Sequence, residues 1–77
     1  MNTNGEKSFT DALSTRSKNG LSRCLGREVL DKPEIIAEVD MARLRLAVGL
    51  GPKSLREIAE ALIKFRYIEN IDIWLES

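Results

Sequence analysis

Six consecutive residues of the chain, 49–54, have the types and the order of a phosphate-binding turn. They read Gly-Leu-Gly-Pro-Lys-Ser and lead directly into an amphipathic run that begins at Leu55. Glycine permits a tight turn and the close approach of another molecule, and Pro52 suits the first position of a helix. The next N–H groups then point outward beside the Lys53 ammonium and the Ser54 hydroxyl, which together can hold an anion. This segment predicts a phosphate-bearing partner, with nucleic acid as the first candidate.

The same segment has a simpler structural interpretation, namely a tight turn between two helices where only glycine fits. Both interpretations require a helix on each side of the turn. Asp40 is typical of a helix N-cap, and the run from Met41 to Ala47 predicts a short helix before the turn. A longer helix is expected from Pro52 or Lys53 to Arg66, which gives a helix-hairpin-helix at about residues 41–66.

The rest of the chain predicts further short helices. Residues 1–8 are expected to form a loose tail before a single domain over 9–77. Ser14 is a good N-cap for a helix from Thr15 to about Leu25, with Gly26 as its C-terminal cap. Gly20 lies inside that helix and is expected to weaken it by up to ~1 kcal/mol relative to alanine.

Beyond Gly26 the expected elements are a turn at Arg27 to Leu30 and a helix started by Asp31 and Pro33. The tail 67–77 fits a strand or a short helix capped by Asn70, and we favour a final turn or short helix that packs Trp74 or Leu75 on the core. The fold class expected is an all-α compact bundle of four or five short helices. Its predicted core side chains are Ile35, Ile36, Val39, Leu44, Val48, Leu55, Ile58, Ala59, Leu62, Ile63 and Phe65.

Composition fits a small globular binding protein. The chain has 77 residues, of which 43% are hydrophobic and 31% charged, enough for one small domain. No apolar run approaches the ~20 residues that span a bilayer, and the polar start shows no signal peptide, so a cytoplasmic location is expected. Cys24 is the only cysteine and histidine is absent, so we expect no intrachain disulfide, no cysteine-based zinc site, no cofactor and no enzymatic activity.

Charge is neutral in sum but uneven along the chain. The formal net charge is +0, which limits a sequence-independent grip on DNA. Residues 1–27 carry a net +3, whereas residues 28–50 carry −2 and residues 51–77 carry −1. This distribution is compatible with ordinary scatter over a solvated surface, or with a small basic patch formed by the first helix and the Lys53 turn.

Two separated motifs give a family resemblance. The first runs from Leu13 to Leu21, Leu-Ser-Thr-Arg-Ser-Lys-Asn-Gly-Leu, and the second from Leu50 to Ile58, Leu-Gly-Pro-Lys-Ser-Leu-Arg-Glu-Ile. In this order they resemble the C-terminal domain of the bacterial RNA polymerase alpha subunit, over roughly residues 9–65. The resemblance implies a small helical bundle with a helix-hairpin-helix, either free-standing or excised from a longer chain.

The resemblance also implies a DNA-binding role in transcription. Arg16 would enter the minor groove of A/T-rich DNA, with Asn19 as a neighbouring polar contact. Gly51, Lys53 and Ser54 match the phosphate-contacting loop, and Glu57 would lie on the same face, where it could pair with Arg16 in the absence of DNA. Physically, the narrow minor groove of A-tracts has an enhanced negative potential that attracts arginine. The supporting positions are Ser17, Lys18, Gly49 and Glu57.

The chain departs from the family pattern where basic residues are expected. The family cysteine after the asparagine is Gly20 here, a basic residue is replaced by Ser22, and Pro52 replaces another and removes an N–H donor. Each of the two losses of charge weakens phosphate affinity. The alternative is therefore a protein-interaction module that docks on a sigma factor, an activator or RNA polymerase and binds little DNA itself.

Overall fold

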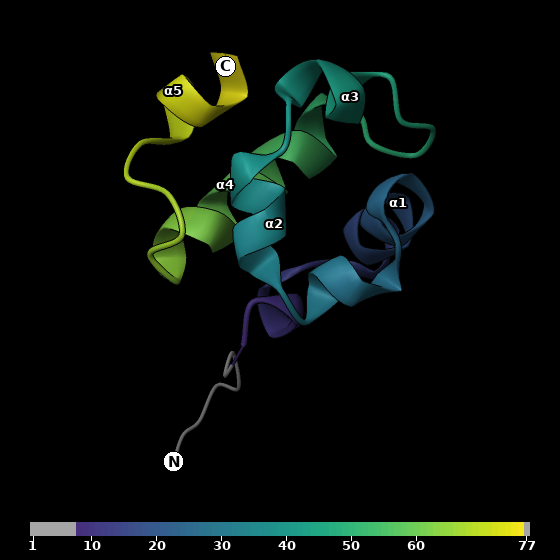
Figure 1. The fold of residues 1–77 in the computed structure, drawn as a ribbon, viewed down its shortest axis with the longest axis horizontal. Coiled ribbons are helices and arrows are strands. Elements are labelled where there is room, and N and C mark those ends of the chain that lie inside the picture. The colour runs from purple at the N-terminus through teal and green to yellow at the C-terminus, as the bar shows by residue number, and fades with distance from the viewer. Residues whose placement is uncertain (1–7, 77) are drawn as a thin grey trace.

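The chain folds from short helices, several of which are fixed at their ends by capping residues. The computed structural model describes residues 8–76, and within this range it has five α-helices, two short 3-10 helices and no strand (Figure 1). The predicted all-α bundle of four or five short helices is therefore confirmed. The helices α1 to α5 span Thr15–Leu25, Pro33–Glu38, Met41–Arg45, Pro52–Lys64 and Ile71–Glu76, and the 3-10 helices η1 and η2 span Thr10–Ala12 and Arg27–Leu30.

Helix α1 begins and ends where the sequence predicts. The Ser14 side chain accepts a hydrogen bond from the Ser17 N–H at 3.3 Å, which satisfies one of the free donors of the first turn. Gly26 ends the helix with a φ of +98°, and its N–H donates to the Ser22 carbonyl at 2.9 Å. Both predicted caps are confirmed, and η2 follows as the predicted extra turn.

Gly20 has a packing role in α1 that the sequence does not reveal. A Cβ atom at this position would lie 2.5 Å from the Leu50 Cδ2 and 3.2 Å from the Gly49 carbonyl oxygen. The missing side chain thus lets the loop between α3 and α4 pack directly against α1. The local cost of glycine in a helix is offset here by a close contact between two segments distant in sequence.

Two predicted features of the middle of the chain are wrong. Helix α2 begins at Pro33 with Lys32 at the N-cap position and no side-chain cap, because Asp31 instead closes η2. Ile35 was expected in the core but is 43% exposed, since Ile36 occupies the inward face of this six-residue helix. Ile35 is about 100° away from Ile36 around the axis and lies outside the narrow inward face of this short helix.

Helix α3 starts as predicted and stops early. The Asp40 carboxylate accepts a hydrogen bond from the Ala42 N–H at 3.0 Å, which confirms this N-cap. The helix ends at Arg45 instead of Ala47, so the next residues follow a loop path rather than the helical period. Val48, expected inside, is consequently 79% exposed, whereas Leu44 is fully buried as predicted.

Helix α4 carries the largest share of the core and ends two residues before the predicted limit at Arg66. Ile58 and Leu62 are fully buried, as expected, while Phe65 is only partly buried against the core and Ile63 is 36% exposed. The helix stops because Arg66 adopts a left-handed conformation with φ of 65°. The Tyr67 N–H then donates to the Leu62 carbonyl at 2.8 Å, in the pattern of a Schellman cap.

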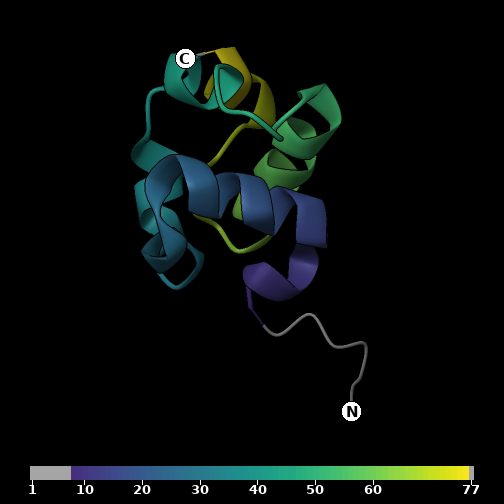
Figure 2. The same ribbon diagram turned by 90° about the vertical axis from the view of Figure 1, so that its right-hand side faces the viewer.

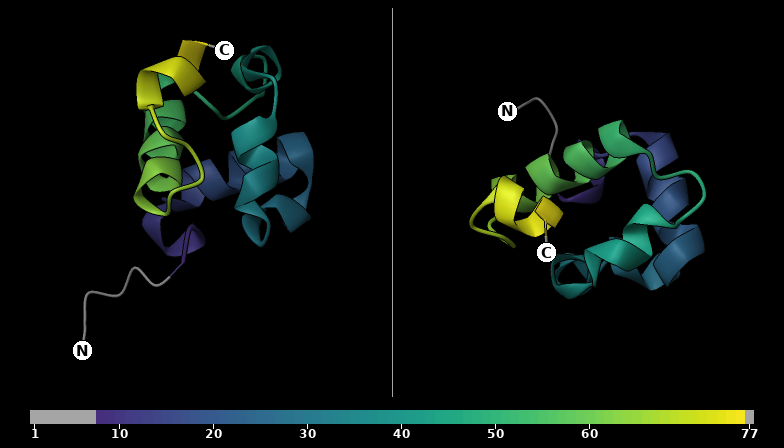
Figure 3. Two further views of the ribbon diagram at one scale, coloured as in Figure 1. Left: turned by 60° about the vertical axis from the view of Figure 1, so that its left-hand side comes forward. Right: turned by 90° about the horizontal axis from the view of Figure 1, so that it is seen from above.

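The C-terminal segment forms the predicted short helix, α5. The Asn70 side chain accepts a hydrogen bond from the Ile73 N–H at 3.0 Å, and Trp74 is 5% exposed. The Trp74 indole Nε1 donates to the Ala37 carbonyl at 3.2 Å, and the Arg45 guanidinium donates to the Leu75 carbonyl. Helix α5 therefore ties α2 and α3 to α4, beside which it lies (Figure 3).

Most of the predicted tail, residues 1–8, lies outside the described residues. Ser8 is described, and its carbonyl accepts a hydrogen bond from the Asp11 N–H at 3.1 Å, so the ordered chain includes at least this residue before Phe9. The radius of gyration is 11.6 Å, close to the value of about 11 Å for a compact domain of this length. Within residues 8–76 no helix combines the length and the apolar character needed to cross a membrane.

Candidate nucleic-acid interface

Helix α1, the loop that precedes α4 and the start of α4 form two neighbouring recesses. The first, which we call the loop recess, has a volume of about 680 Å³ and the second, the helix recess, about 390 Å³. Arg16 and Gly49 line both, so the two recesses form one surface, which we call the α1–loop face. The loop recess is lined by Arg16, Gly49, Leu50, Gly51, Pro52, Lys53 and Ser54, and the helix recess by Thr15, Arg16, Asn19, Gly20, Arg23, Val48 and Gly49.

The loop between α3 and α4, residues 46–51, is held against α1 by its own apolar residue. Leu50 is 5% exposed, and its side chain occupies the space beside Gly20 where a Cβ atom would otherwise lie. Gly49 has a φ of +92°, a conformation that favours glycine. Figure 1 shows this loop reaching from α3 over α1, and Figure 2 shows α1 crossing the front of the molecule below it. The two predicted motifs, distant in sequence, are thereby brought side by side.

The N-terminus of α4 opens into the loop recess without a side-chain cap. Gly51 occupies the N-cap position in an extended conformation, and Pro52 is the first helical residue. Among residues 8–76 no side chain accepts from the N–H groups of the first turn, which leaves those of Lys53 and Ser54 without a side-chain cap at the positive end of a 13-residue helix. Gly51 and Lys53 are exposed, whereas Ser54 is 7% exposed and lies at the base of the recess.

The N-terminus of α1 is, in contrast, already occupied by a carboxylate. Glu57 on α4 accepts hydrogen bonds from the Ser14 N–H at 3.0 Å and from the Ser14 Oγ at 2.9 Å. It also accepts from the Ser17 Oγ. Glu57 thus caps α1 from the neighbouring helix, so the anion position at this terminus is filled from within the chain.

These hydrogen bonds lower the pKa of Glu57. The largest cause is the hydrogen bond from the Ser17 hydroxyl, which outweighs the opposing effect of burial, and the two donors of Ser14 lower it further. The expected pairing of Glu57 with Arg16 is not present within residues 8–76, because the carboxylate is turned to the two serines. Arg16 is exposed and faces both recesses.

The supporting residues from the sequence analysis divide into two groups. Gly49 lines both recesses, as a supporting contact should. Ser17 is fully buried and donates to Glu57, so it positions α1 and does not reach a ligand. Lys18 is half-buried and lines neither recess.

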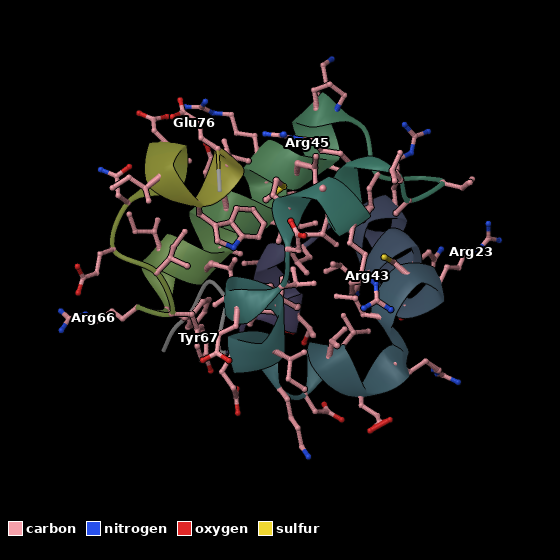
Figure 4. All side chains as sticks on the ribbon, turned by 45° about the horizontal axis from the view of Figure 1, so that its top comes forward. Arg23, Arg43, Arg45, Arg66, Tyr67 and Glu76 are labelled. Carbon is pink, nitrogen blue, oxygen red and sulfur yellow. The ribbon has the colours of Figure 1, made fainter. Side chains whose placement is uncertain are left out.

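Arg23 and Val48 are among the residues of the α1–loop face that sequence reasoning missed. Arg23 follows Arg16 and Asn19 at the i, i+3, i+7 spacing, which places all three on one side of α1. It is exposed and projects outward from the helix (Figure 4). The helical spacing from Arg16 was the available signal for Arg23, whereas Val48 carried none, because its exposure depends on where α3 ends.

The α1–loop face concentrates positive charge in a neutral chain. Its lining residues include Arg16, Arg23 and Lys53 but no aspartate or glutamate. The formal net charge of the whole chain is +0, so the acidic side chains lie elsewhere. A surface of this kind attracts an anionic partner locally, and its field is short-ranged at physiological salt.

The function of the α1–loop face cannot be assigned from metal ligands or from similarity to a known protein. Within residues 8–76 no three histidine, cysteine, aspartate or glutamate side chains are grouped as metal ligands would be. Comparison of the chain with protein-family models, with curated proteins and with solved structures found no match. The geometry and charge of the α1–loop face are therefore the features from which a function can be inferred.

Proposed function

We propose that this chain is a DNA-binding module that contacts A/T-rich minor groove and backbone phosphates in transcription or its regulation. The observation that carries the proposal is the shared recess of Arg16 with the Gly49–Ser54 segment. In this proposal the module is of the RNA polymerase alpha C-terminal type, with α3, the loop and α4 as its helix-hairpin-helix. It binds without catalysing a reaction.

The chemistry of the two recesses suits a duplex. Arg16 is a single exposed guanidinium, and A-tract minor grooves draw in such a group by their negative potential. On one side of it, Lys53 and the N–H groups that begin α4 suit a backbone phosphate. On the other side, Asn19 and Arg23 lie along α1 and suit a second phosphate or the groove edge.

Salt titration of duplex binding tests the proposal most directly. Fluorescence anisotropy with a labelled A/T-rich duplex should show binding at low salt that weakens steeply as salt rises. Three cationic side chains on the face predict a slope of about −3 in a plot of log affinity against log salt. Absence of binding to an A/T-rich duplex at low salt would overturn the proposal.

A chemical-shift map of the same complex locates the interface. We expect the largest amide shifts at residues 16–23 and 48–54, the two segments of the α1–loop face. Shifts concentrated on α2 or α5 would place the ligand elsewhere and contradict the assigned site. Arg27, exposed in η2 and lining neither recess, provides a reference position that should move little.

A neighbouring cleft, which shares Leu50 and Pro52 with the loop recess, supports a second candidate function, a protein-interaction module that docks on RNA polymerase, a sigma factor or an activator. This cleft has a volume of about 480 Å³ and lies between α3, the start of α4 and α5. Its lining is apolar apart from two arginines, and it includes no carboxylate. The lining residues are Met41, Arg45, Leu50, Pro52, Leu55, Arg56 and Leu75.

Charge reversal on this cleft distinguishes the second function from the first. Arg56 is exposed, so Arg56→Glu should weaken capture of purified RNA polymerase or sigma factor while leaving duplex binding nearly intact. Arg27→Glu is the matched control, because Arg27 is exposed and does not line the cleft. Equal capture by the wild type and both variants would contradict the docking function at this cleft.

A further inference from the structure

Val48 is an apolar side chain exposed in the middle of a charged surface. It is 79% exposed and lies in the loop that follows α3, which ends at Arg45. Its neighbours in the helix recess are Arg16, Asn19 and Arg23. A single exposed valine needs no explanation by itself. Because Val48 lies beside cationic side chains, however, a partner that covers it would have to offer both anionic groups and apolar surface.

Two properties of the chain limit how much of a duplex contact can be electrostatic. The formal net charge is +0, and the α1–loop face carries three cationic side chains. Pro52, at the first position of α4, also lacks an N–H that could donate to a phosphate. With so few cationic groups and donors, we expect part of the affinity for a duplex to come from contacts that do not depend on charge.

The minor groove offers apolar surface in its deoxyribose walls, and proteins that bind there frequently bring apolar side chains into it, many of them as wedges between base steps. Arg16 lines both recesses, whereas Lys53 lines the loop recess and Val48 lines the helix recess. If Arg16 enters the groove, Lys53 and Val48 therefore each border a recess next to the inserted side chain.

We propose that Val48 makes an apolar contact with the sugar wall of the minor groove that Arg16 enters, and that this contact supplies a salt-independent part of the affinity. The inference rests on the proposed DNA-binding function and deepens it. It assigns a role to a residue that neither the charge pattern nor the two motifs single out.

The test compares two serine substitutions in the same loop. Leu46 is 85% exposed and lines neither recess, so Leu46→Ser is matched to Val48→Ser in loop position and change of polarity. With an A/T-rich duplex, Val48→Ser should bind about fivefold more weakly, as expected for partial burial of two methyl groups. Its salt slope should equal that of the wild type, and the heat-capacity change of binding should become less negative. Leu46→Ser should bind as the wild type does.

Each other outcome overturns the inference in a recognisable way. Wild-type affinity for Val48→Ser overturns the inference alone, provided that Arg16→Ala still weakens binding. An equal loss for Leu46→Ser, or a reduced salt slope for Val48→Ser, also overturns it, because the valine would then act on the loop or on the cations. Failure of the wild type to bind any duplex overturns both the inference and the proposed function. Circular dichroism and thermal melting of both variants establish that each is folded.

Discussion

Ser14 stands at the junction of the two helices that carry the α1–loop face. Its side chain caps α1, and both its N–H and its hydroxyl donate to Glu57 on α4. The carboxylate thereby fills the positive end of α1, whereas the equivalent end of α4 has no side-chain acceptor. At the scale of single residues, we propose that this asymmetry favours an external anion at Lys53 and its neighbours over one at Ser14.

Arg16 and Lys53 are predicted to contribute differently to duplex binding. Arg16→Ala should remove the preference for A/T-rich over G/C-rich duplex and weaken A/T-rich binding about tenfold, because the groove contact is lost. Lys53→Ala should weaken binding to both duplexes alike and reduce the salt slope by about 0.9, as a phosphate contact does. Anisotropy titrations with both duplexes at several salt concentrations measure both effects, with Arg27→Ala as the control. Loss of the same size on both duplexes for both variants would contradict these roles.

Glu57 gives a pH-dependent contribution to stability whose sign follows from its pKa. The folded-state pKa lies below the ordinary value of 4.5, so the charged form is favoured by folding. The contribution is complete above about pH 4.5 and is lost as pH falls through the lowered pKa. Glu57→Gln should therefore reduce the free energy of unfolding by about 1 kcal/mol at pH 7, with the difference from the wild type shrinking below pH 4.5.

Thermal melting across this pH range checks the Glu57 prediction. A loss of that size corresponds to a melting temperature lower by roughly 4–8 °C in a domain of this length. Glu60→Gln is the control, because Glu60 lies on the same helix in an exposed ion pair with Arg56 at 3.5 Å, a pair of small energetic value. A constant difference between the wild type and Glu57→Gln from pH 7 to acid would show that the charge of Glu57 plays no part.

At the scale of elements, the ends of the helices decide which residues reach the surface. Local chemistry predicted the caps at Ser14, Gly26 and Asp40, because each cap needs only its own residue type and the adjacent N–H groups. The early end of α3 was not predictable in this way. No residue of the predicted helix from Met41 to Ala47 is a helix breaker, so the sequence gives no signal for a helix end at Arg45. Val48, beyond this end, is exposed as a result.

The candidate site, like the helix ends, could be predicted from the sequence only in part. The exposed positions Arg16 and Lys53 follow from motif and helix phase, as does the turn between α3 and α4. The burial of Ser17 and the packing role of Gly20 do not, because both depend on how α1 rotates against α4 and the loop. Such contacts are set by tertiary packing, which a local pattern does not encode.

Arg66 is a residue other than glycine in the left-handed conformation that ends α4, and replacing it should stabilise the fold. It ends α4 at φ of 65°, a position that glycine usually takes, and its side chain projects outward (Figure 4). Arg66→Gly should remove the steric cost of this conformation and raise the free energy of unfolding by about 0.5 kcal/mol, after allowing for the greater freedom of glycine in the unfolded chain. Thermal melting should show a rise of roughly 2–4 °C.

The control for this substitution lies two residues earlier. Lys64→Gly changes the last helical residue of α4, where glycine has no conformational advantage, and should lower stability by about 1 kcal/mol or less. A lower melting temperature for Arg66→Gly would show that the arginine side chain itself stabilises the fold by more than its backbone strain costs.

At the scale of the whole molecule, the α1–loop face depends on a core that joins every α-helix. Leu21, Ile36, Leu44 and Leu62 are fully buried in one cluster drawn from α1, α2, α3 and α4. Helix α5 completes the cluster through Trp74. A chain of 77 residues has a total stability of roughly 4–12 kcal/mol, so the loss of one large core side chain affects the entire fold.

Trp74 therefore tests whether the molecule is one cooperative unit. It is 5% exposed, donates to the Ala37 carbonyl at 3.2 Å and holds α5 against α2. Trp74→Ala should lower the free energy of unfolding by about 3–5 kcal/mol, and calorimetry should show one transition at a much lower temperature. Ile73→Ala, at a position 68% exposed, is the control and should change stability by less than about 1 kcal/mol. Because α1, the loop and α4 share this core, duplex affinity above the lowered transition should vanish in Trp74→Ala. A variant that loses α5 alone and retains the wild-type melting of α1 and α4 would show that the α1–loop face folds independently of the C-terminal helix.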